Sequence, residues 1–312
     1  MATNSQDLDL TVLLPVFNEE EALPAIIQEI KDVLDPHQWV YEILVIDDGS
    51  TDRSAELADS CGVRVVRKVK NSGSGSARRL GVIHAYGQIV CMLDADGSYD
   101  PSTIPEMMTY FPEYDQVNGA RDKEKGTLPI LRKPIKYLLR MFASYLARQH
   151  IPDLNTGLKA FKRNLMRQYL WVVPDGFSCV TTMTLAFFCN DHAVKYVPTR
   201  YRQRIGQSKF HPIKDTLKYF LTIIRIIVYF KPLSVFIPVS IFLFVMAIVI
   251  PLINYSTSNS SGLIFQQLSN LQVLLFLSAG ITLIGGLLAD LLVSTHRQHQ
   301  FDKEIDNDRD ST

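Results

Sequence analysis

Short apolar runs, rich in valine, isoleucine and leucine, recur along the first hundred residues of the chain. Continuous runs of this length are typical of strands that are buried on both faces of a sheet. They predict strands at residues 10–16, 42–47, 63–69 and 89–93. Helical patterns lie between them, at residues 20–34, 52–61 and 76–86. Because strands and helices alternate, we expect an α/β domain built on a mostly parallel sheet.

A different pattern occupies the last quarter of the chain, where no charged residue occurs between Pro232 and Ala289. Two apolar runs inside it, residues 233–253 and 271–293, are each long enough to cross a bilayer core, which takes about 20 helical residues. Prolines within such a run are tolerated in membrane helices. The alternative is a buried hairpin of a soluble core, but the rest of the chain is too short to wrap two such helices. We therefore expect two transmembrane helices.

Basic residues flank both expected spans and are absent from the loop between them. They are Lys209, Lys214, Lys218, Arg225 and Lys231 before the first span, and Arg297 and Lys303 after the second. The positive-inside rule then places both termini in the cytoplasm. The expected organisation is a soluble domain at 1–210, a juxtamembrane amphipathic helix at 211–231, a membrane hairpin at 232–294 and a polar tail at 295–312. No cleavable signal peptide is expected, because no basic region followed by an apolar run opens the chain.

One more segment has an interfacial pattern. Between residues 130 and 150, apolar residues recur at helical spacing while Arg132, Lys133, Lys136 and Arg140 occupy the other side. A basic amphipathic helix of this kind suits the headgroup layer; the alternative is an ordinary surface helix packed on its own domain. In the second span, Gly285 and Ala289 form a small-x-x-x-small pair that would allow helices to pack in a homo-oligomer.

Composition narrows the functional classes. The 312 residues are enough for one large domain with an appendage. The 32 basic and 32 acidic side chains cancel, so no bulk charge points to a nucleic-acid partner. The four cysteines show neither C-x-x-C nor zinc-type spacing, and we expect them to be reduced.

Candidate chemistry gathers where the expected strands end. The first ends in P-V-F-N-E-E from Pro15, the second in D-D-G-S from Asp47, and the fourth in D-A-D from Asp94. Ligands of parallel α/β sheets bind beyond the carboxyl ends of the strands. In extended backbone Asp94 and Asp96 point the same way. Such a pair suits Mg²⁺ or Mn²⁺, which would keep positions open for phosphate oxygens.

The stretch from Gly73 to Arg79, G-S-G-S-A-R-R, invites a dinucleotide-binding interpretation. However, Arg78 stands where the third glycine belongs, and the stretch follows the third strand instead of the first. A hydride-transfer enzyme is therefore not expected. We expect these glycines to let the start of a helix approach the crevice closely.

Together with the stretch Asn71 to Gly87, these motifs resemble the inverting glycosyltransferases of family 2, which have the GT-A fold. The resemblance covers about residues 10–210. D-L-N-T-G-L-K-A-F from Asp153 and R-I-G-Q-S-K from Arg204 are similar to motifs of the polyprenyl-phosphate glycosyltransferases. That type includes dolichol-phosphate mannose synthase and bacterial undecaprenyl-phosphate glucosyltransferases. Two C-terminal spans fit the bacterial enzymes and favour a bacterial inner membrane.

The resemblance implies roles for individual residues. Pro15, Asn18, Glu19 and Asp47 would line the nucleotide pocket, with Asp94 and Asp96 holding the metal and the diphosphate. Asp96, Arg121 and Asp153 would form the catalytic set. The residues that would meet phosphate or the lipid acceptor are Arg132, Arg140, Arg204, Ser208 and Lys209. Local alternatives remain: Asn18, Asp47 or Asp153 as helix caps, Arg121 as a surface ion pair, and Asp48, Gly49 and Ser50 as a turn.

The implied reaction moves a sugar from a nucleotide-diphospho-sugar donor to a polyprenyl phosphate, with Mg²⁺ or Mn²⁺ as cofactor. A phosphate acceptor is largely ionised near neutral pH, so a histidine base is not required. Gly97-Ser98-Tyr99 replaces the run expected of a mannose enzyme, which favours a UDP-sugar such as UDP-glucose. A processive polysaccharide synthase is the alternative, but its Q-x-x-R-W motif is missing; a scaffold on a dead transferase domain would have lost the acids at the strand ends.

Overall fold

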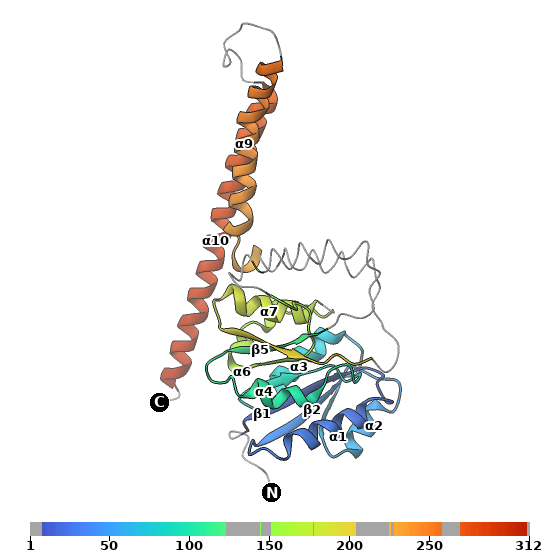
Figure 1. Ribbon diagram of the computed structural model, residues 1–312. Helices are drawn as coiled ribbons and strands as arrows, with labels where there is room; N and C mark the ends of the chain where they lie inside the picture. Colours follow the sequence, from blue (N-terminus) through green and yellow to red (C-terminus); the bar gives the residue numbers. More distant parts are fainter. Residues whose placement is uncertain are drawn as a thin grey trace. The chain divides into compact units, whose positions relative to one another are not determined.

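A computed structural model describes residues 8–122, 144, 151–176, 178–203, 225, 228–257 and 269–310. The chain divides into two compact units, Met1–Ile223 and Ile224–Thr312. The first unit holds a sheet with helices, and the second holds two long helices (Figure 1).

The first unit is built on a seven-stranded sheet with the order β3-β2-β1-β4-β6-β5-β7. Its strands are β1 (Leu10–Val16), β2 (Tyr41–Asp47), β3 (Arg64–Arg67), β4 (Ile89–Met92), β5 (Gln116–Arg121), β6 (Lys159–Lys162) and β7 (Val194–Thr199). Only β6 runs antiparallel to its neighbours, β4 and β5; the other pairs are parallel. The predicted mostly parallel α/β sheet is confirmed.

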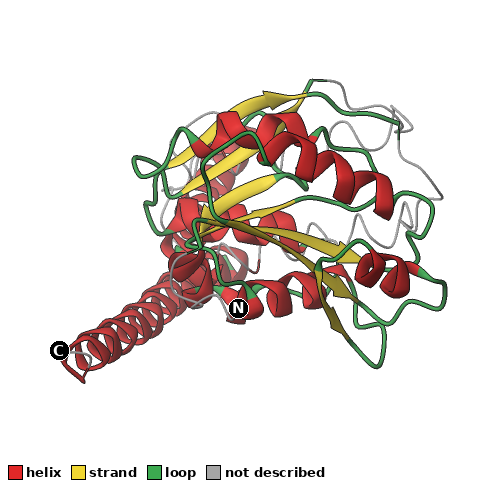
Figure 2. Cartoon of the chain, turned by 90° about the horizontal axis from the view of Figure 1, so that it is seen from below, coloured by secondary structure: helices red, strands yellow, loops and turns green. Residues whose placement is uncertain are grey.

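Helices cover both faces of this sheet (Figure 2). They are α1 (Leu23–Leu34), α2 (Ser54–Ser60), α3 (Ser74–His84), α4 (Ile104–Met108), α6 (Arg163–Gln168) and α7 (Cys179–Cys189), with short 3₁₀ turns at Pro101–Thr103 and Leu170–Val172. Along β1 successive side chains point to opposite faces. Val12 and Leu14 belong to the core cluster that includes the buried stripe of α1, whereas Leu13 lies against Gly81 of α3. The continuous apolar run of β1 follows from this two-sided burial.

The order of the strands fixes where a ligand site can form. From β1 the chain adds β2 and then β3 on one side, and then returns to place β4 on the other side of β1. In open α/β sheets the crevice lies at such a reversal, beyond the carboxyl ends of the strands. Residues after Val16 of β1 and after Met92 of β4 therefore face one crevice.

The second unit contains α9 (Leu233–Thr257) and α10 (Asn270–Asp310). Leu233–Ile253 has a mean hydropathy of 2.8 and Asn270–Thr295 one of 2.1, and 11% of the most apolar window of each is buried. Ser240 Oγ donates to the carbonyl of Ala279 at 2.9 Å, and the rings of Phe244 and Phe276 lie 5.4 Å apart. Helices that bury so little of an apolar surface are typical of lipid-facing segments. The two expected apolar helices are confirmed, and α10 continues as a helix into the predicted polar tail.

Candidate active site

A cleft of about 410 Å³ opens at the carboxyl ends of β1 and β4. Its wall is formed by Pro15, Val16, Phe17, Glu19, Asp48, Asn71, Gly73, Ser74, Ala77, Arg78, Asp94, Ala95, Asp96, Tyr99, Arg121, Asn155, Gly157, Gly176, Val180 and Tyr201. The site therefore combines loops that are far apart in the sequence, from the end of β1 to the residue that follows β7 by two positions.

Asp94 and Asp96 follow β4 and both line the cleft. Asp94 Oδ1 forms an ion pair with the guanidinium of Arg78, a buried residue of α3. Asp96 Oδ1 accepts from Ser98 N at 3.0 Å and from Ser98 Oγ at 2.5 Å. Burial opposes the charge on Arg78, but the neighbouring Cys179 and Asp94 raise its pKa, so the guanidinium remains a cation.

The chemistry of these two carboxylates fits a hard divalent cation. Mg²⁺ is commonly held by one or two carboxylates together with substrate phosphates. Within the described part of the chain, no group of three or more His, Cys, Asp or Glu side chains is placed to hold a metal. A cation at this site would therefore depend on oxygen atoms of the substrate as well as on Asp94 and Asp96.

Arg121, at the end of β5, makes a two-point contact with Asp153. Nε lies 2.6 Å from Oδ2 and Nη2 lies 2.9 Å from Oδ1. The side chains are only 14% and 7% exposed, so the pair is largely buried and does not lie on the open surface. Burial alone would raise the pKa of Asp153, but the hydrogen bonds and charge of Arg121 hold that pKa below its ordinary value. Arg121 lines the cleft, and Asp153 is not among the residues of the wall.

Two tyrosines complete this side of the cleft. The hydroxyl of Tyr99 accepts from Gly157 N at 2.6 Å, and its ring meets that of Tyr201 edge-on at 5.3 Å. The Arg121 Cζ atom lies 5.3 Å from the centre of the Tyr201 ring. Tyr99 therefore supports the loop at Gly157 through a hydrogen bond, and Tyr201 supports Arg121 through a cation–π contact.

On the expected donor side, Asp47 stabilises the turn that follows it, and Asn18 links the loop after β1 to the loop after β2. Asp47 Oδ1 accepts from Ser50 N at 3.1 Å, and Asn18 Oδ1 accepts from Thr51 N at 2.8 Å. Asn18 has a φ of 53°, a backbone conformation that asparagine adopts more readily than most residues. Pro15 and Glu19 lie in the wall of the cleft, whereas Asn18 and Asp47 do not. Neither residue caps a helix, because α1 and α2 begin after Ala22 and Arg53 without a side-chain cap. A contact of Asn18 or Asp47 with the nucleotide stays a prediction.

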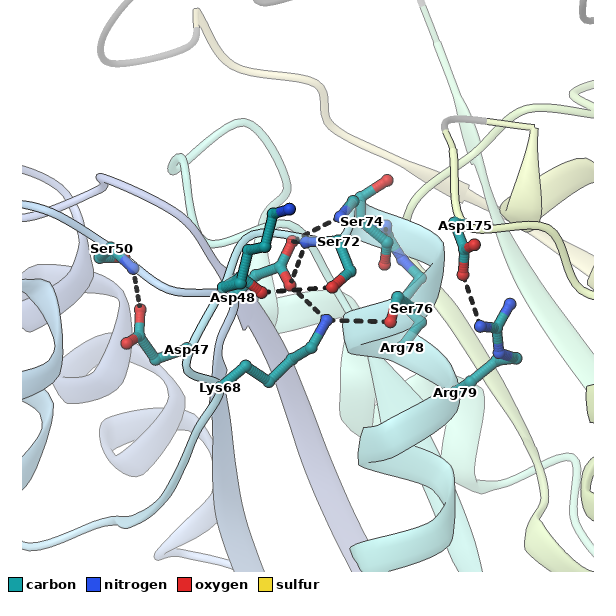
Figure 3. A network of polar contacts seen from close by, with 12 residues as sticks. Asp47, Asp48, Ser50, Lys68, Ser72, Ser74, Ser76, Arg78, Arg79 and Asp175 are labelled. Carbon is teal, nitrogen blue, oxygen red and sulfur yellow. Dashed lines mark hydrogen bonds and ion pairs between the residues drawn. The ribbon is translucent and has the colours of Figure 1, made fainter.

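Asp48, which the sequence assigns to a turn, instead reaches the start of α3 (Figure 3). Its carboxylate accepts from Gly73 N at 2.8 Å and from Ser72 N at 3.1 Å. Lys68 Nζ lies 2.5 Å from Asp48 Oδ1 and donates to Ser76 Oγ at 2.9 Å. The start of a helix favours an anion. Here the buried carboxylate of Asp48 binds the N–H groups that lead into α3. The turn after β2 is also present, with a φ of 74° at Gly49, so Asp48 combines the expected turn with a contact that the sequence does not predict.

The glycines of G-S-G-S-A-R-R permit a close backbone contact. Gly73 has a φ of 98°, and a Cβ atom on Gly73 or Gly75 would overlap the backbone of Asp175 or Pro174. Gly75 N donates to the carbonyl of Asp175 at 2.8 Å. Gly73 and Ser74 line the cleft, as expected for this helix start, and the glycines also bring it against the backbone of residues 174–175.

The comparison with protein families identifies the domain that carries this cleft. Residues 11–172, about half of the chain, match the model of glycosyl transferase family 2. The chain belongs to glycosyl transferase family 2.

The chain is similar to curated glycosyltransferases, two of which carry a polyprenyl phosphate in their names. A dolichyl-phosphate hexose transferase from Haloferax volcanii is 29% identical over 65% of this chain and 87% of its own. Glycosyltransferase AglJ of the same organism is 29% identical over 92% of this chain and 94% of its own. An undecaprenyl-phosphate 4-deoxy-4-formamido-L-arabinose transferase from Pectobacterium carotovorum is 31% identical over 52% of this chain and 51% of its own. The resemblance to the polyprenyl-phosphate type is confirmed.

A solved structure confirms the GT-A fold. It is glucosyl-3-phosphoglycerate synthase from Mycobacterium tuberculosis, in complex with Mn²⁺, uridine-diphosphate and glucosyl-3-phosphoglycerate. The TM-score is 0.55 with 19% sequence identity, over 70% of this chain and 80% of that one. At this identity the likeness shows the fold alone.

The glycosyltransferase site contains residues that sequence reasoning missed. Asp48, Arg78, Tyr99 and Tyr201 all line the cleft. A further buried group is Lys159, which is 0% exposed and donates from Nζ to Thr184 Oγ1 at 2.6 Å and to Asn118 Oδ1 at 3.3 Å. Burial lowers the pKa of Lys159 to about 7, against the charge of Asp153, which raises it.

The remaining predicted residues lie outside the described part of the chain. They are Arg132, Arg140, Arg204, Ser208 and Lys209. The amphipathic segments at 130–150 and 211–231 fall largely outside it as well. Their assignments remain predictions.

Proposed function

We propose that this glycosyltransferase moves a sugar from a UDP-sugar, with UDP-glucose favoured, to a polyprenyl phosphate at the cytoplasmic face of a membrane. One observation carries the proposal. Asp94, Asp96 and Arg121 line a single cleft, in a family 2 chain that continues into two apolar helices. Such a cleft suits a diphosphate, and such helices suit an acceptor with a lipid tail.

The contacts around α3 support one placement of the donor. The carboxylate of Asp48 occupies the anion-favouring start of that helix. The diphosphate therefore belongs near Asp94 and Asp96, with the guanidinium of Arg121 in the same cleft. Mg²⁺ or Mn²⁺ held by the two carboxylates would neutralise charge on the diphosphate oxygens. The solved relative with Mn²⁺ and uridine-diphosphate is in keeping with this cofactor and donor class.

The proposed reaction needs no strong base. An oxygen of the lipid phosphate attacks the anomeric carbon of the sugar from the face opposite the diphosphate. The bond between that carbon and the diphosphate oxygen breaks, and its electron pair leaves with UDP, so the anomeric configuration inverts. The acceptor oxygen is already ionised near neutral pH, and no proton has to be removed. What the protein must supply is stabilisation of the charge that develops on UDP, and the fixed cation of Arg121 contributes to it.

Residues beyond the described cleft complete the proposal. Arg204, Ser208 and Lys209 would close over phosphate, and Arg132 and Arg140 would guide the lipid acceptor. The basic flanks of the two spans support cytoplasmic termini and catalytic domain, in a bacterial inner membrane. A Ser261→Cys variant tests that orientation in oriented vesicles. Cys61, a half-buried free cysteine of the catalytic domain, is replaced by serine in this variant. An impermeant maleimide should then label position 261 only from the side opposite the catalytic domain, and labelling of position 261 from the same side would contradict the topology.

The donor and acceptor are tested with the full chain in lipid nanodiscs that contain undecaprenyl phosphate. UDP-glucose, UDP-galactose, UDP-N-acetylglucosamine and GDP-mannose are compared, each with Mn²⁺ and with a chelator. We expect sugar in the lipid fraction from a UDP-sugar, no product from GDP-mannose, and no product with the chelator. Transfer that occurs only to a water-soluble acceptor such as phosphoglycerate would contradict the lipid acceptor, and full transfer with the chelator would contradict the metal.

A further inference from the structure

The segment Val173–Gly176 is fastened to the first turns of α3 by three contacts. Arg79 Nη2 lies 2.5 Å from Asp175 Oδ1 (Figure 3). Arg79 Nη1 also donates to the carbonyl of Val173, and Gly75 N donates to the carbonyl of Asp175 at 2.8 Å. Side-chain and main-chain contacts thus fix this segment on the helix.

The same part of the chain also borders the cleft. Gly176 and Val180 lie in its wall. From α7, Thr181 Oγ1 donates to Asn155 Oδ1 at 3.3 Å, and Asn155 lines the cleft as well. Residues 173–176 and 178–181 therefore join the wall made by α3 to the wall made by the loop after Asp153.

Two consecutive arginines of α3 make contacts with different parts of the site. Arg79 holds the 173–176 segment, whereas Arg78 pairs with Asp94 and also donates to Cys179 Sγ at 3.7 Å. Neighbouring residues on an α-helix point about 100° apart. A contact at Arg79 consequently restrains the rotation of the helix that presents Arg78 to Asp94.

We propose that Arg79 is a positioning residue for donor binding. Its contacts with the 173–176 segment hold the first turns of α3, and through Arg78 they hold Asp94 in the orientation that receives the donor diphosphate. The identity of the donor in this inference rests on the proposed function. The inference itself is that Arg79, which lies outside the wall of the cleft, affects how tightly the donor binds.

Exposure separates this role from a stabilising one. The side chains of Arg79 and Asp175 are 30% and 62% exposed. Ion pairs this accessible to water contribute little to global stability. If the pair only stabilised the fold, its removal would change the free energy of unfolding little. Any loss of folded protein would lower kcat, but the KM of the molecules that stay folded would not change.

The test uses the full chain in nanodiscs, with UDP as the probe. Binding of UDP is measured by calorimetry with and without Mn²⁺, and initial rates are measured against UDP-sugar concentration. Arg79→Met removes both side-chain contacts, Arg79→Lys keeps a cation, and Asp175→Asn keeps an acceptor oxygen. Arg167→Met is the matched control, because Arg167 is an exposed arginine on α6 that does not line the cleft.

We expect Arg79→Met to raise the Kd of UDP with Mn²⁺ and the donor KM about tenfold, as misplacement of a binding group does. Arg79→Lys and Asp175→Asn should show smaller increases, and Arg167→Met none. If Arg79→Met fails to fold, Asp175→Asn decides the outcome. Unchanged Kd and KM in the folded variants, or a fall in kcat alone, would overturn the inference. A wild-type protein that binds no UDP and transfers no sugar would instead overturn the proposed function, and this inference with it.

Discussion

Arg121 holds Asp153 at two points, with Nε 2.6 Å from Oδ2 and Nη2 2.9 Å from Oδ1. The pair joins the end of β5 to the loop before β6, and both side chains are largely buried. This geometry fixes the plane of the guanidinium at the edge of the cleft. Asp153 therefore contacts Arg121, which lines the cleft, while Asp153 itself is not part of the cleft wall. Its place in the predicted catalytic set stays a prediction.

The first prediction concerns the loss of this pair. Arg121→Met leaves a buried carboxylate without its cation, and such a loss costs about 3 kcal/mol of unfolding free energy. Because the pKa of Asp153 is depressed in the folded state, the pair stabilises the protein above the unfolded pKa of about 3.8, and this contribution disappears as the pH falls through the folded pKa. Denaturant unfolding at pH 7 checks the loss. Equal stability of Arg121→Met and the control Arg167→Met would contradict it.

The second prediction concerns the contact of α3 with the 173–176 segment. A Cβ atom on Gly75 would overlap the carbonyl of Pro174, whereas one on Gly176 meets nothing within 4 Å. Gly75→Ala should therefore lower the unfolding free energy by about 1–3 kcal/mol, as overpacking does. Gly176→Ala should leave it nearly unchanged. Denaturant unfolding of the two variants provides the comparison, and similar midpoints would show that the segment moves aside without cost.

The third prediction concerns Lys159, whose pKa burial lowers from 10.5 to about 7. Between these values the unfolded chain binds the lysine proton and the folded protein does not, so this group makes the free energy of unfolding rise with pH. Lys159→Met removes that part of the rise. The unfolding midpoints of wild type and variant, measured from pH 7 to pH 10, should diverge as the pH increases. Parallel profiles would mean that Lys159 keeps its proton inside the fold.

The sequence predicts the elements whose burial follows from a local run of apolar residues. β1, β2 and β4 are continuous apolar runs, and the spans of α9 and α10 lack charge. β6 was missed because Lys159-Ala160-Phe161-Lys162 does not read as a buried strand, although Lys159 is fully buried. α7 is also hard to predict, because all of its residues are buried and the helix therefore lacks the polar face that produces an amphipathic pattern.

The sequence predicts the site residues that directly follow an apolar strand. Asp94 and Asp96 follow an apolar strand, and they lie in the cleft. The choice between Asp47 and Asp48 depends on contacts with residues 68–76, which no local pattern reveals. Tyr99 and Tyr201 meet across 102 positions of the sequence. Long-range contacts of this kind need the fold itself.

The measurement that tests the central claim most directly is the transfer of labelled sugar from UDP-sugar into undecaprenyl phosphate by wild type and Asp96→Asn in the same nanodiscs. Asp96 lines the cleft, and the Asn side chain keeps an oxygen that can accept the hydrogen bonds from Ser98, so Asp96→Asn should spare the fold. We predict labelled lipid and equimolar UDP from the wild type, and a rate at least about 100-fold lower from a folded Asp96→Asn protein. Labelled lipid formed at an equal rate by both proteins would contradict the account.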